Sequence, residues 1–450
     1  MGRQIARDVE PGQVLEQLPG SLILRCATQE DTEPLAEFQR WVHYGAERPA
    51  PGNVPITRDL MKGGMPGFAV QDWTLVVDSE TGEIVSTLYL VSQTWSYRGI
   101  EIPAGRVELV ATHPDYRRRG LVRRQMQVVH EWSRRRGELM MGISGIPWYY
   151  RQFGYEMALE HRGGRAGPLD AMPGSLNGES APVRLRPARE TDLAWIAGLH
   201  ERGTRRYLLS CVRGEAVWRY DLLGRSTDAS NFYRVCVIEA EDGAGLGVLV
   251  HQTSATAEAI IYEVDEDSFD RTNSAVFRHL RAVADAHSES GERQDVAMIL
   301  GSSHPAYAAA GELLPREVKP YAWYLRVPDL PAFLSHVAPV IEARLARSEF
   351  AGFSGSLRLN FIGSGLRLSL DHGRLAAIES WMPPQHDNRL APRERDAMFP
   401  GLTVLQLLCG FRSVEDLEYA FPDCLMSSDK TRRLLNAMFP VEPSSLIGIA

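Results

Sequence analysis

The stretch from Ala111 to Met126 carries five arginines around a single glycine, in a chain whose net charge is −8. It follows an apolar run, Gly105–His113, that is typical of a strand, and it leads into a periodic run typical of a helix. A helix amino terminus offers free backbone N–H groups and the positive end of the helix dipole, and both attract phosphates. Arg117–Val122 therefore predicts a pyrophosphate site, with Gly120 at the close turn. The alternatives are a solvated basic face or an RNA-binding patch.

The composition is that of an ordinary globular protein, with 44% hydrophobic and 24% charged residues. Its 450 residues correspond to about three domains of typical size. The modest negative charge argues against a general nucleic-acid-binding protein. No run of 18 apolar residues occurs, and the first twenty residues lack the apolar core of a signal peptide. We therefore expect a cytoplasmic protein that binds neither nucleic acid nor membrane.

The cysteines indicate neither a disulfide framework nor a metal site. Their number, five, is odd, no pair has the CxxC spacing, and none lies beside a histidine at ligand spacing. This pattern fits a reducing compartment. We accordingly expect no metal.

Composition and turn residues divide the chain into four parts. Residues 1–20 are typical of a tail, and mixed strand and helix patterns follow over 21–170. A stretch rich in Gly, Pro and Ser at 167–182 predicts a linker. The pattern restarts over 183–327, and a third region, 328–450, begins with an amphipathic helix followed by strands joined by tight turns.

Two short matches indicate that the second region repeats the first. Leu185–Asp192 has Leu, Arg, Ala and Asp at the same offsets as Leu24–Asp31. Tyr307–Gly311 then repeats the spacing of Tyr150–Gly154, in the same order along the chain. Such echoes predict a duplicated domain. The part of the second copy that corresponds to the arginine stretch is acidic, so only the first copy is expected to keep the anion site.

The segment Val110–Val122 resembles the acyl-CoA signature of the GNAT N-acetyltransferase superfamily, Arg/Gln-x-x-Gly-x-Gly/Ala. Arg117 and Gly120 match this signature, and Val122 stands where Gly or Ala is usual. The segment from Tyr150 to Tyr155 is similar to the superfamily's Tyr-x-x-x-Gly-Phe/Tyr pattern. A GNAT domain is therefore expected in the first region.

Beyond its first twenty residues, the whole chain resembles the Eis (enhanced intracellular survival) family of bacterial acetyltransferases, in which the RRRG run and a Tyr-x-x-Phe-Gly-Tyr segment are usual. The resemblance implies an α/β (α+β) fold. A catalytic GNAT domain at 21–170 and a degenerate second GNAT domain at 183–327 would precede a sterol-carrier-protein-like α+β domain at 328–450. It also implies acetyl-CoA as donor, a homohexamer, and amine acceptors such as aminoglycosides, polyamines or protein lysines.

The resemblance further assigns site residues. The family's strand before the loop holds the acetyl and pantetheine arm, its loop holds the pyrophosphate, and a Ser-Glu loop adds a contact whose Glu is absent here. By position these contacts fall on Val110, Ala111, Thr112, Arg117, Arg118, Arg119, Gly120, Leu121, Val122, Arg123 and Ser144.

Transfer of an acetyl group to an amine requires a general acid and a general base. An alkylamine with a pKa of about 10.4 must lose a proton before it attacks a thioester. Backbone N–H groups at 110–112 would bind the oxyanion. A tyrosine with a pKa near 10 can donate to a thiolate whose thiol has a pKa near 8.5, and Tyr150 is the candidate general acid. The alternative is that Tyr150 is a core aromatic residue.

Two groups compete for the role of base. In the Eis family the chain's own terminal carboxylate serves, and that role falls on the main-chain carboxylate of Ala450. With an ordinary pKa of about 3.5 it would need desolvation, act through water, or only hold the ammonium group. Glu108 is the rival, because strand alternation puts it on one face with Val110 and Thr112. The alternative is that Glu108 is a solvent-facing strand residue without a role in the reaction.

Two other functions fit the same sequence. The chain could be a non-catalytic CoA-binding regulatory protein that keeps the fold without turnover. The third region could carry a sterol or lipid.

Overall fold

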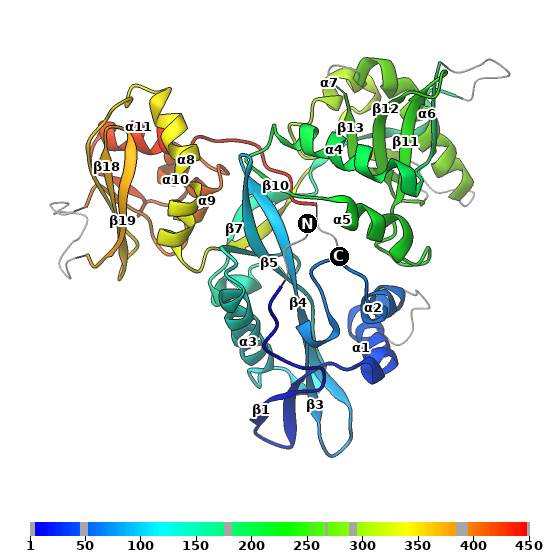
Figure 1. Cartoon of the computed structure of the whole chain (residues 1–450), viewed down its shortest axis with the longest axis horizontal. Coiled ribbons are helices and arrows are strands. Elements are labelled where there is room, and N and C mark those ends of the chain that lie inside the picture. Colours follow the sequence, from blue (N-terminus) through cyan, green and yellow to red (C-terminus); the bar gives the residue numbers. More distant parts are fainter. Residues whose placement is uncertain are drawn as a thin grey trace.

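The computed structural model describes residues 5–45, 53–174, 182–254, 256–265, 269–287, 295–383 and 395–447. The chain folds into three lobes of mixed α/β structure, each built on its own sheet (Figure 1). Within these ranges no helix has the length and apolar character needed to cross a bilayer.

The first sheet lies in the lower lobe of Figure 1 and runs β1-β2-β3-β4-β5-β6-β16-β7, with β10 paired to β4. Its one parallel pair within the described chain is β5–β6. The strands are β1 (Val14–Leu18), β2 (Leu22–Cys26), β3 (Trp73–Asp78), β4 (Ile84–Tyr97), β5 (Ile100–Thr112), β6 (Met140–Ile143), β7 (Glu156–His161), β10 (Leu209–Cys211) and β16 (Tyr321–Arg326).

Helices cover both faces of this sheet, α1 (Thr32–Tyr44) and α2 (Asn53–Lys62) on one side and α3 (Leu121–Arg135) on the other (Figure 1). Alternation along β4 explains the two cores. Leu88 and Leu90 pack with Met126 of α3, whereas Tyr89 and Val91 pack with the core of α1 and α2. Both faces are therefore buried, and α3 is fixed at the edge where β5 ends.

The amino-terminal residues contribute more than the expected tail over 1–20. Val14–Leu18 form β1, which pairs antiparallel with β2 along the edge of the first sheet. Val9 is also buried, at 7% exposure. Because an unpaired edge strand leaves a row of backbone groups unsatisfied, β2 gains hydrogen bonds from this addition.

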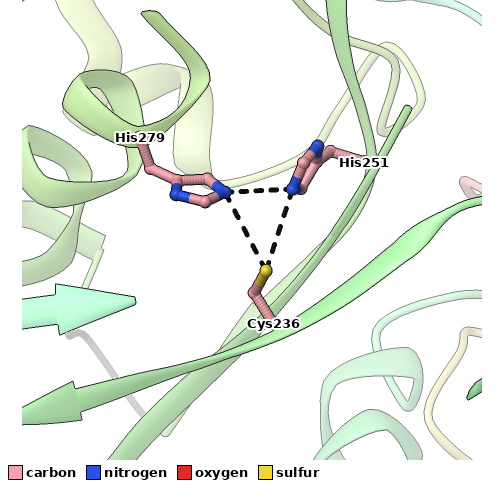
Figure 2. A group of neighbouring side chains, drawn as sticks. All are labelled: Cys236, His251 and His279. Carbon is pink, nitrogen blue, oxygen red and sulfur yellow. Dashed lines mark hydrogen bonds between the residues drawn. The ribbon is translucent and has the colours of Figure 1, made fainter. Parts of the chain in front are cut away.

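The second sheet, in the green lobe of Figure 1, runs β15-β8-β14-β13-β12-β11-β9. Cys236, His251 and His279 come from β11, β12 and α6 of this lobe and point toward one another (Figure 2). The elements are β8 (Gly164–Pro168), β9 (Val183–Pro187), β11 (Arg234–Ala240), β12 (Gly245–His251), β13 (Ala257–Val264), β14 (Asp295–Met298), β15 (Arg316–Val318), α4 (Leu193–Thr204), α5 (Glu215–Arg219), α6 (Phe269–His287) and α7 (Ala306–Ala310).

The two sheets have the same strand order, which confirms the expectation of a repeated fold. β2-β3-β4-β5-β6-β16-β7 of the first corresponds position by position to β9-β11-β12-β13-β14-β8-β15 of the second. Within the described chain each sheet contains one parallel pair, which is β5–β6 in the first sheet and β13–β14 in the second.

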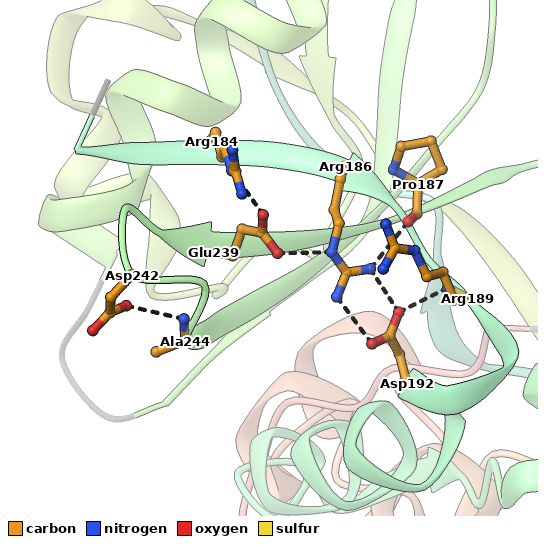
Figure 3. A network of polar contacts seen from close by, with 8 residues as sticks. All are labelled: Arg184, Arg186, Pro187, Arg189, Asp192, Glu239, Asp242 and Ala244. Atoms are coloured by element: carbon orange, nitrogen blue, oxygen red, sulfur yellow. Dashed lines mark hydrogen bonds and ion pairs between the residues drawn. The ribbon is translucent and has the colours of Figure 1, made fainter. Parts of the chain in front are cut away.

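The sequence echo is also a structural echo. Arg25 donates two hydrogen bonds to Asp31, at 2.7 and 2.6 Å. Arg186 does the same to Asp192, at 2.7 and 3.0 Å, and extends the network to Glu239 (Figure 3). The same offsets thus encode the same strand-to-helix connection twice.

The two halves exchange strands, and β10 of the second half also pairs with β4 of the first sheet. β16, from the end of the second half, lies between β6 and β7 in the first sheet. β8, from the end of the first half, lies between β14 and β15 in the second sheet. The predicted boundaries 21–170 and 183–327 follow chain order, so they divide both sheets at this exchange.

The third lobe holds the sheet β19-β18-β17-β20-β21 and packs on the first through a shared core. Tyr97 donates a hydrogen bond to the carbonyl of Leu408 at 2.7 Å, and its ring meets Phe333 edge-on at 5.6 Å. The elements are β17 (Gly355–Asn360), β18 (Gly365–Asp371), β19 (Arg374–Trp381), β20 (Ala397–Met398), β21 (Leu425–Met426), α8 (Leu330–Ala346), α9 (Val404–Leu408), α10 (Val414–Ala420) and α11 (Asp429–Met438).

Candidate active site

The central feature of the site is an unpaired length of β5. β5 and β6 pair only from Ala104↔Met140 to Arg106↔Gly142, yet β5 continues to Thr112. Within the described chain, residues 107–112 have no neighbouring strand on the side that faces away from β4. Their outward backbone groups are therefore available to a ligand that lies along the strand. Val110, Ala111 and Thr112, predicted from the sequence, lie on this segment.

A bulge sets the direction of this segment. The register between β4 and β5 passes from Tyr89↔Glu108 to Thr87↔Ala111, so β5 carries one extra residue. Leu109 takes a left-handed backbone with φ of 46°, which costs a branched side chain about 1 kcal/mol. Gln39 of α1 donates to the Leu109 carbonyl at 3.1 Å and helps to hold the bulge.

The arginine turn lies just beyond the end of β5. Arg118 and Gly120 both have left-handed backbones, with φ of 63° and 76°. A Cβ on Gly120 would meet nothing within 4 Å, and Arg117–Arg119 are exposed, so the turn is open to solvent. α3 begins at Leu121, and its first N–H groups have no acceptor inside the helix. Phosphate oxygens can therefore reach both backbone donors and guanidinium groups.

The predicted arginines are held differently. The Arg119 guanidinium lies 4.5 Å from the centroid of the Tyr116 ring and donates to the Asp115 carbonyl at 3.2 Å. Arg123, one turn into α3, donates to Gln152 at 2.8 Å. That bond ties the start of α3, just after the arginine turn, to the segment that carries Tyr150. Leu121 is buried and Val122 half-buried, so these two offer backbone groups only.

Gln125 anchors α3 to the sheet, a contribution that no motif indicated. Its Nε2 donates to Thr74 of β3 at 3.1 Å, and its Oε1 accepts from Ser86 of β4 at 2.7 Å. Ser86 in turn lies 2.9 Å from the Thr112 hydroxyl. The side chain is fully buried, so the helix amino terminus is fixed relative to the end of β5.

Tyr150 lies in a short 3₁₀ turn, Tyr149–Phe153, and is 3% exposed. Its ring meets Tyr149 edge-on at 5.3 Å and Tyr324 at 5.6 Å. Burial raises the pKa of Tyr150, and the negative charge of Glu108 raises it further. Among the described residues, none forms a hydrogen bond with its hydroxyl, so the proton can point to a substrate. Tyr324 reaches this position only because β16 is exchanged into the first sheet.

Glu108 forms a partly buried ion pair with Arg106. Burial raises the pKa of Glu108, although the charge and hydrogen bonding of Arg106 oppose the shift. The Arg106 guanidinium also lies 4.9 Å from the Trp323 ring centroid. Glu108 is therefore a carboxyl with raised basicity beside the unpaired strand, and it is not solvent-facing.

A cavity of about 260 Å³ lies where the lobes meet. It is lined by Arg106 and Ser144 of the first lobe, by residues of the second lobe such as Tyr233, and by the carboxy-terminal segment 444–447. That segment passes from the third lobe toward the centre of the molecule (Figure 1). It is held there by Ser445 N–H donating to the Leu209 carbonyl at 2.8 Å and Trp323 Nε1 donating to the Leu446 carbonyl at 3.2 Å.

The structure thus brings most predicted residues together, but not all. The end of β5, the arginine turn and Tyr150 share one side of the first sheet. Ser144 instead faces the cavity at the end of β6. Ala450 lies outside the described residues.

Comparisons with known proteins concern the type of domain and its fold. The family model of the acetyltransferase (GNAT) domain matches residues 24–158. No curated protein matches the chain closely enough by sequence to count as a relative.

Three solved structures are similar over nearly their whole length. A probable N-acyltransferase from Enterococcus faecalis has a TM-score of 0.65 at 13% identity, covering 95% of this chain and 100% of that one. A GCN5-related N-acetyltransferase from Kribbella flavida has a TM-score of 0.62 at 19% identity, and the match covers 95% of this chain and 99% of that one. Eis1 from Mycobacterium abscessus has a TM-score of 0.57 at 15% identity, and the match covers 93% of this chain and 98% of that one. At these identities the likeness shows the fold.

Residues 24–158 therefore form a GNAT acetyltransferase domain, and the expectation of an acyltransferase is confirmed. The expected mixed α/β fold is confirmed as well.

Proposed function

We propose that this chain transfers the acetyl group of acetyl-CoA to an amine acceptor. One observation carries the proposal: the unpaired end of β5 leads directly into the open arginine turn at the amino terminus of α3. A long donor with an amide-containing arm and a pyrophosphate fits such a continuous line of backbone donors. In this arrangement Val110–Thr112 bind the acyl end and Arg117–Arg123 bind the pyrophosphate.

The reaction itself breaks the thioester C–S bond and forms a C–N bond. The neutral amine attacks the carbonyl, and outward N–H groups of 110–112 stabilise the oxyanion. The amine nitrogen must then lose a proton to a base, and the leaving thiolate must receive one. We assign the second proton to Tyr150, whose raised pKa keeps it in the protonated form that donation requires.

For the base we favour the main-chain carboxylate of Ala450. The segment that precedes it, 444–447, lines the cavity beside Arg106, and three further residues span at most about 11 Å. Glu108 is the competing base, since its pKa is raised and it lies beside the unpaired strand. Its ion pair with Arg106 opposes proton uptake, which is the reason to prefer the terminal carboxylate.

The acceptors we propose are aminoglycosides, polyamines or protein lysines. Glu160 and Tyr233 line the cavity with an anionic and an aromatic group, and both suit a cationic amine. We also propose that the chain assembles as a homohexamer, which light scattering of the purified chain would test.

The test is thiol release from acetyl-CoA with a panel of aminoglycosides, polyamines, lysine peptides and a blank without amine. Saturable release with one amine class would support the transferase and identify the acceptor. Release no faster than the blank, with acetyl-CoA still bound, would favour the alternative of a CoA-binding regulatory protein.

Two variants separate the candidate bases. One extra glycine after Ala450 keeps every side chain but moves the terminal carboxylate by about 3.5 Å, and kcat should fall at least about 100-fold with unchanged acetyl-CoA affinity. Glu108→Gln is the matched comparison and should retain most of the activity. If Glu108→Gln abolishes turnover and the extended chain works normally, Glu108 is the base.

A further inference from the structure

The second lobe holds a cluster of one cysteine and two histidines that the acyl-transfer chemistry does not use. Cys236 Sγ lies 3.8 Å from His251 Nε2 and 3.9 Å from His279 Nε2, and the two nitrogens are 3.0 Å apart (Figure 2). Cys236 is 1% exposed and His251 is 0% exposed, while His279 is half-buried. All three ligand atoms point to one centre.

The size of this triangle matches the requirements of a metal ion. Zinc takes nitrogen at about 2.05 Å and thiolate sulfur at about 2.3 Å. With the separations above, a point that satisfies all three bond lengths exists about 0.5 Å out of the plane of the three atoms. No ligand atom has to move to reach that point.

The surroundings orient one ligand as metal sites require. His251 Nδ1 lies 2.9 Å from the Gln252 carbonyl, which accepts a hydrogen bond only if Nδ1 carries the proton. Nε2 of the neutral ring then holds its lone pair toward the centre, as in metal-binding histidines whose other nitrogen donates to a carbonyl. Within the described part of the chain the group contains no fourth His, Cys, Asp or Glu. The fourth position of a tetrahedral ion would go to water.

The cluster lies where the repeated fold joins a helix to its sheet. In the first lobe, Gln125 of α3 pins that helix to β3 and β4. α6, β11 and β12 are the corresponding elements of the second lobe, and they supply His279, Cys236 and His251. The second copy thus has this cluster of one cysteine and two histidines where the first copy has a hydrogen-bonded glutamine.

We propose that Cys236, His251 and His279 bind one zinc ion, which fixes α6 to the second sheet. One thiolate and two imidazoles favour zinc over magnesium or calcium, which prefer oxygen ligands. On binding, the Cys236 thiol gives its proton to solvent and the sulfur forms the bond to the metal. The site lies outside the acyl-transfer site and does not depend on the proposed function.

The experiment uses the full chain without an affinity tag, stripped by a chelator and then titrated with zinc chloride. Mass spectrometry of the dialysed protein should find one zinc per chain, and the melting temperature should rise with zinc. Cobalt substitution should give a thiolate-to-metal charge-transfer band. A chain that binds no stoichiometric zinc and shows no such band overturns the proposal, and this outcome needs no variant.

Variants then locate the metal. Cys236→Ala and His279→Gln should each weaken zinc binding by more than about 100-fold, beyond the range for residues that only support ligands. Matched controls are Cys424→Ala, a buried thiol in the third lobe, and His287→Gln, the exposed histidine that ends α6. Circular dichroism checks the fold of each. Zinc retained by both ligand variants, or lost in the controls, would refute the assignment.

Discussion

Replacing Tyr150 by phenylalanine is the sharpest test of the proposed acid. The ring keeps its edge contacts with Tyr149 and Tyr324, and none of the described residues loses a hydrogen bond with the hydroxyl. The free energy of unfolding should therefore change by less than about 1 kcal/mol. Any large effect on rate then reports on chemistry.

The expected loss follows from the two pKa values. A phenol near 10 gives its proton to a thiolate whose thiol is near 8.5 at a cost of about 2 kcal/mol, and burial of Tyr150 widens that gap. Transfer is uphill, so Tyr150 belongs at the lower end of the range for general acids, about 100-fold in kcat. That factor corresponds to about 2.7 kcal/mol of barrier. KM for acetyl-CoA should not change.

The assay is thiol release at saturating acetyl-CoA between pH 6 and 10, with Tyr149→Phe as the matched control. Since the pKa of Tyr150 is raised above its usual value near 10, its acid form persists below that pH and causes no falling limb there. Tyr149→Phe should keep the wild-type rate. If Tyr150→Phe retains half of the wild-type kcat, or removes a falling limb centred below pH 9, the reasoning is refuted.

Gly120→Ala should raise KM for acetyl-CoA about fivefold, because a φ of 76° costs an alanine about 1 kcal/mol. Gly99→Ala, with φ of 91° in a hairpin turn, should leave KM unchanged in the same initial-rate assay. Burial alone would raise the pKa of Asp31, but its hydrogen bonds outweigh burial and lower the pKa, so its stabilisation exists above about pH 4 and is lost as pH falls. Asp31→Asn should therefore lower the urea midpoint at pH 7 and flatten its decline below pH 4. Tyr97→Phe leaves a buried carbonyl without its donor and should lower the melting temperature, at a cost of about 1–3 kcal/mol, whereas Tyr419→Phe, 93% exposed, should not.

Local sequence was enough to predict the strand end, the glycine turn and the helix start of the candidate site. The strand before Thr112, the glycine turn at Gly120 and the helix from Leu121 all lie where the pattern predicted. The reason is that a strand end, a left-handed turn and a helix start are each encoded within a few neighbouring residues. The repeat of Leu24–Asp31 in Leu185–Asp192 could be recognised for the same reason. In each copy the arginine and the aspartate of the short segment form hydrogen bonds with each other.

Partners distant in the chain were decided only by the tertiary structure. Nothing near Tyr324 in the sequence indicates that it packs on Tyr150, because that contact depends on the exchange of β16 into the first sheet. Cys236 and His251 are separated by 15 residues, a spacing that matches no short metal motif.

Sequence by itself determined the class of fold, the duplication and the position of the arginine turn of this protein. Tertiary structure decided which strands complete each sheet, that segment 444–447 lines the cavity with Arg106, and that β11, β12 and α6 bring one thiol and two imidazoles together. The physical reason is that the backbone edge of a strand can form hydrogen bonds with any strand of suitable register. Which strands pair is therefore decided by the burial of side chains on both faces of the sheet, across the whole domain.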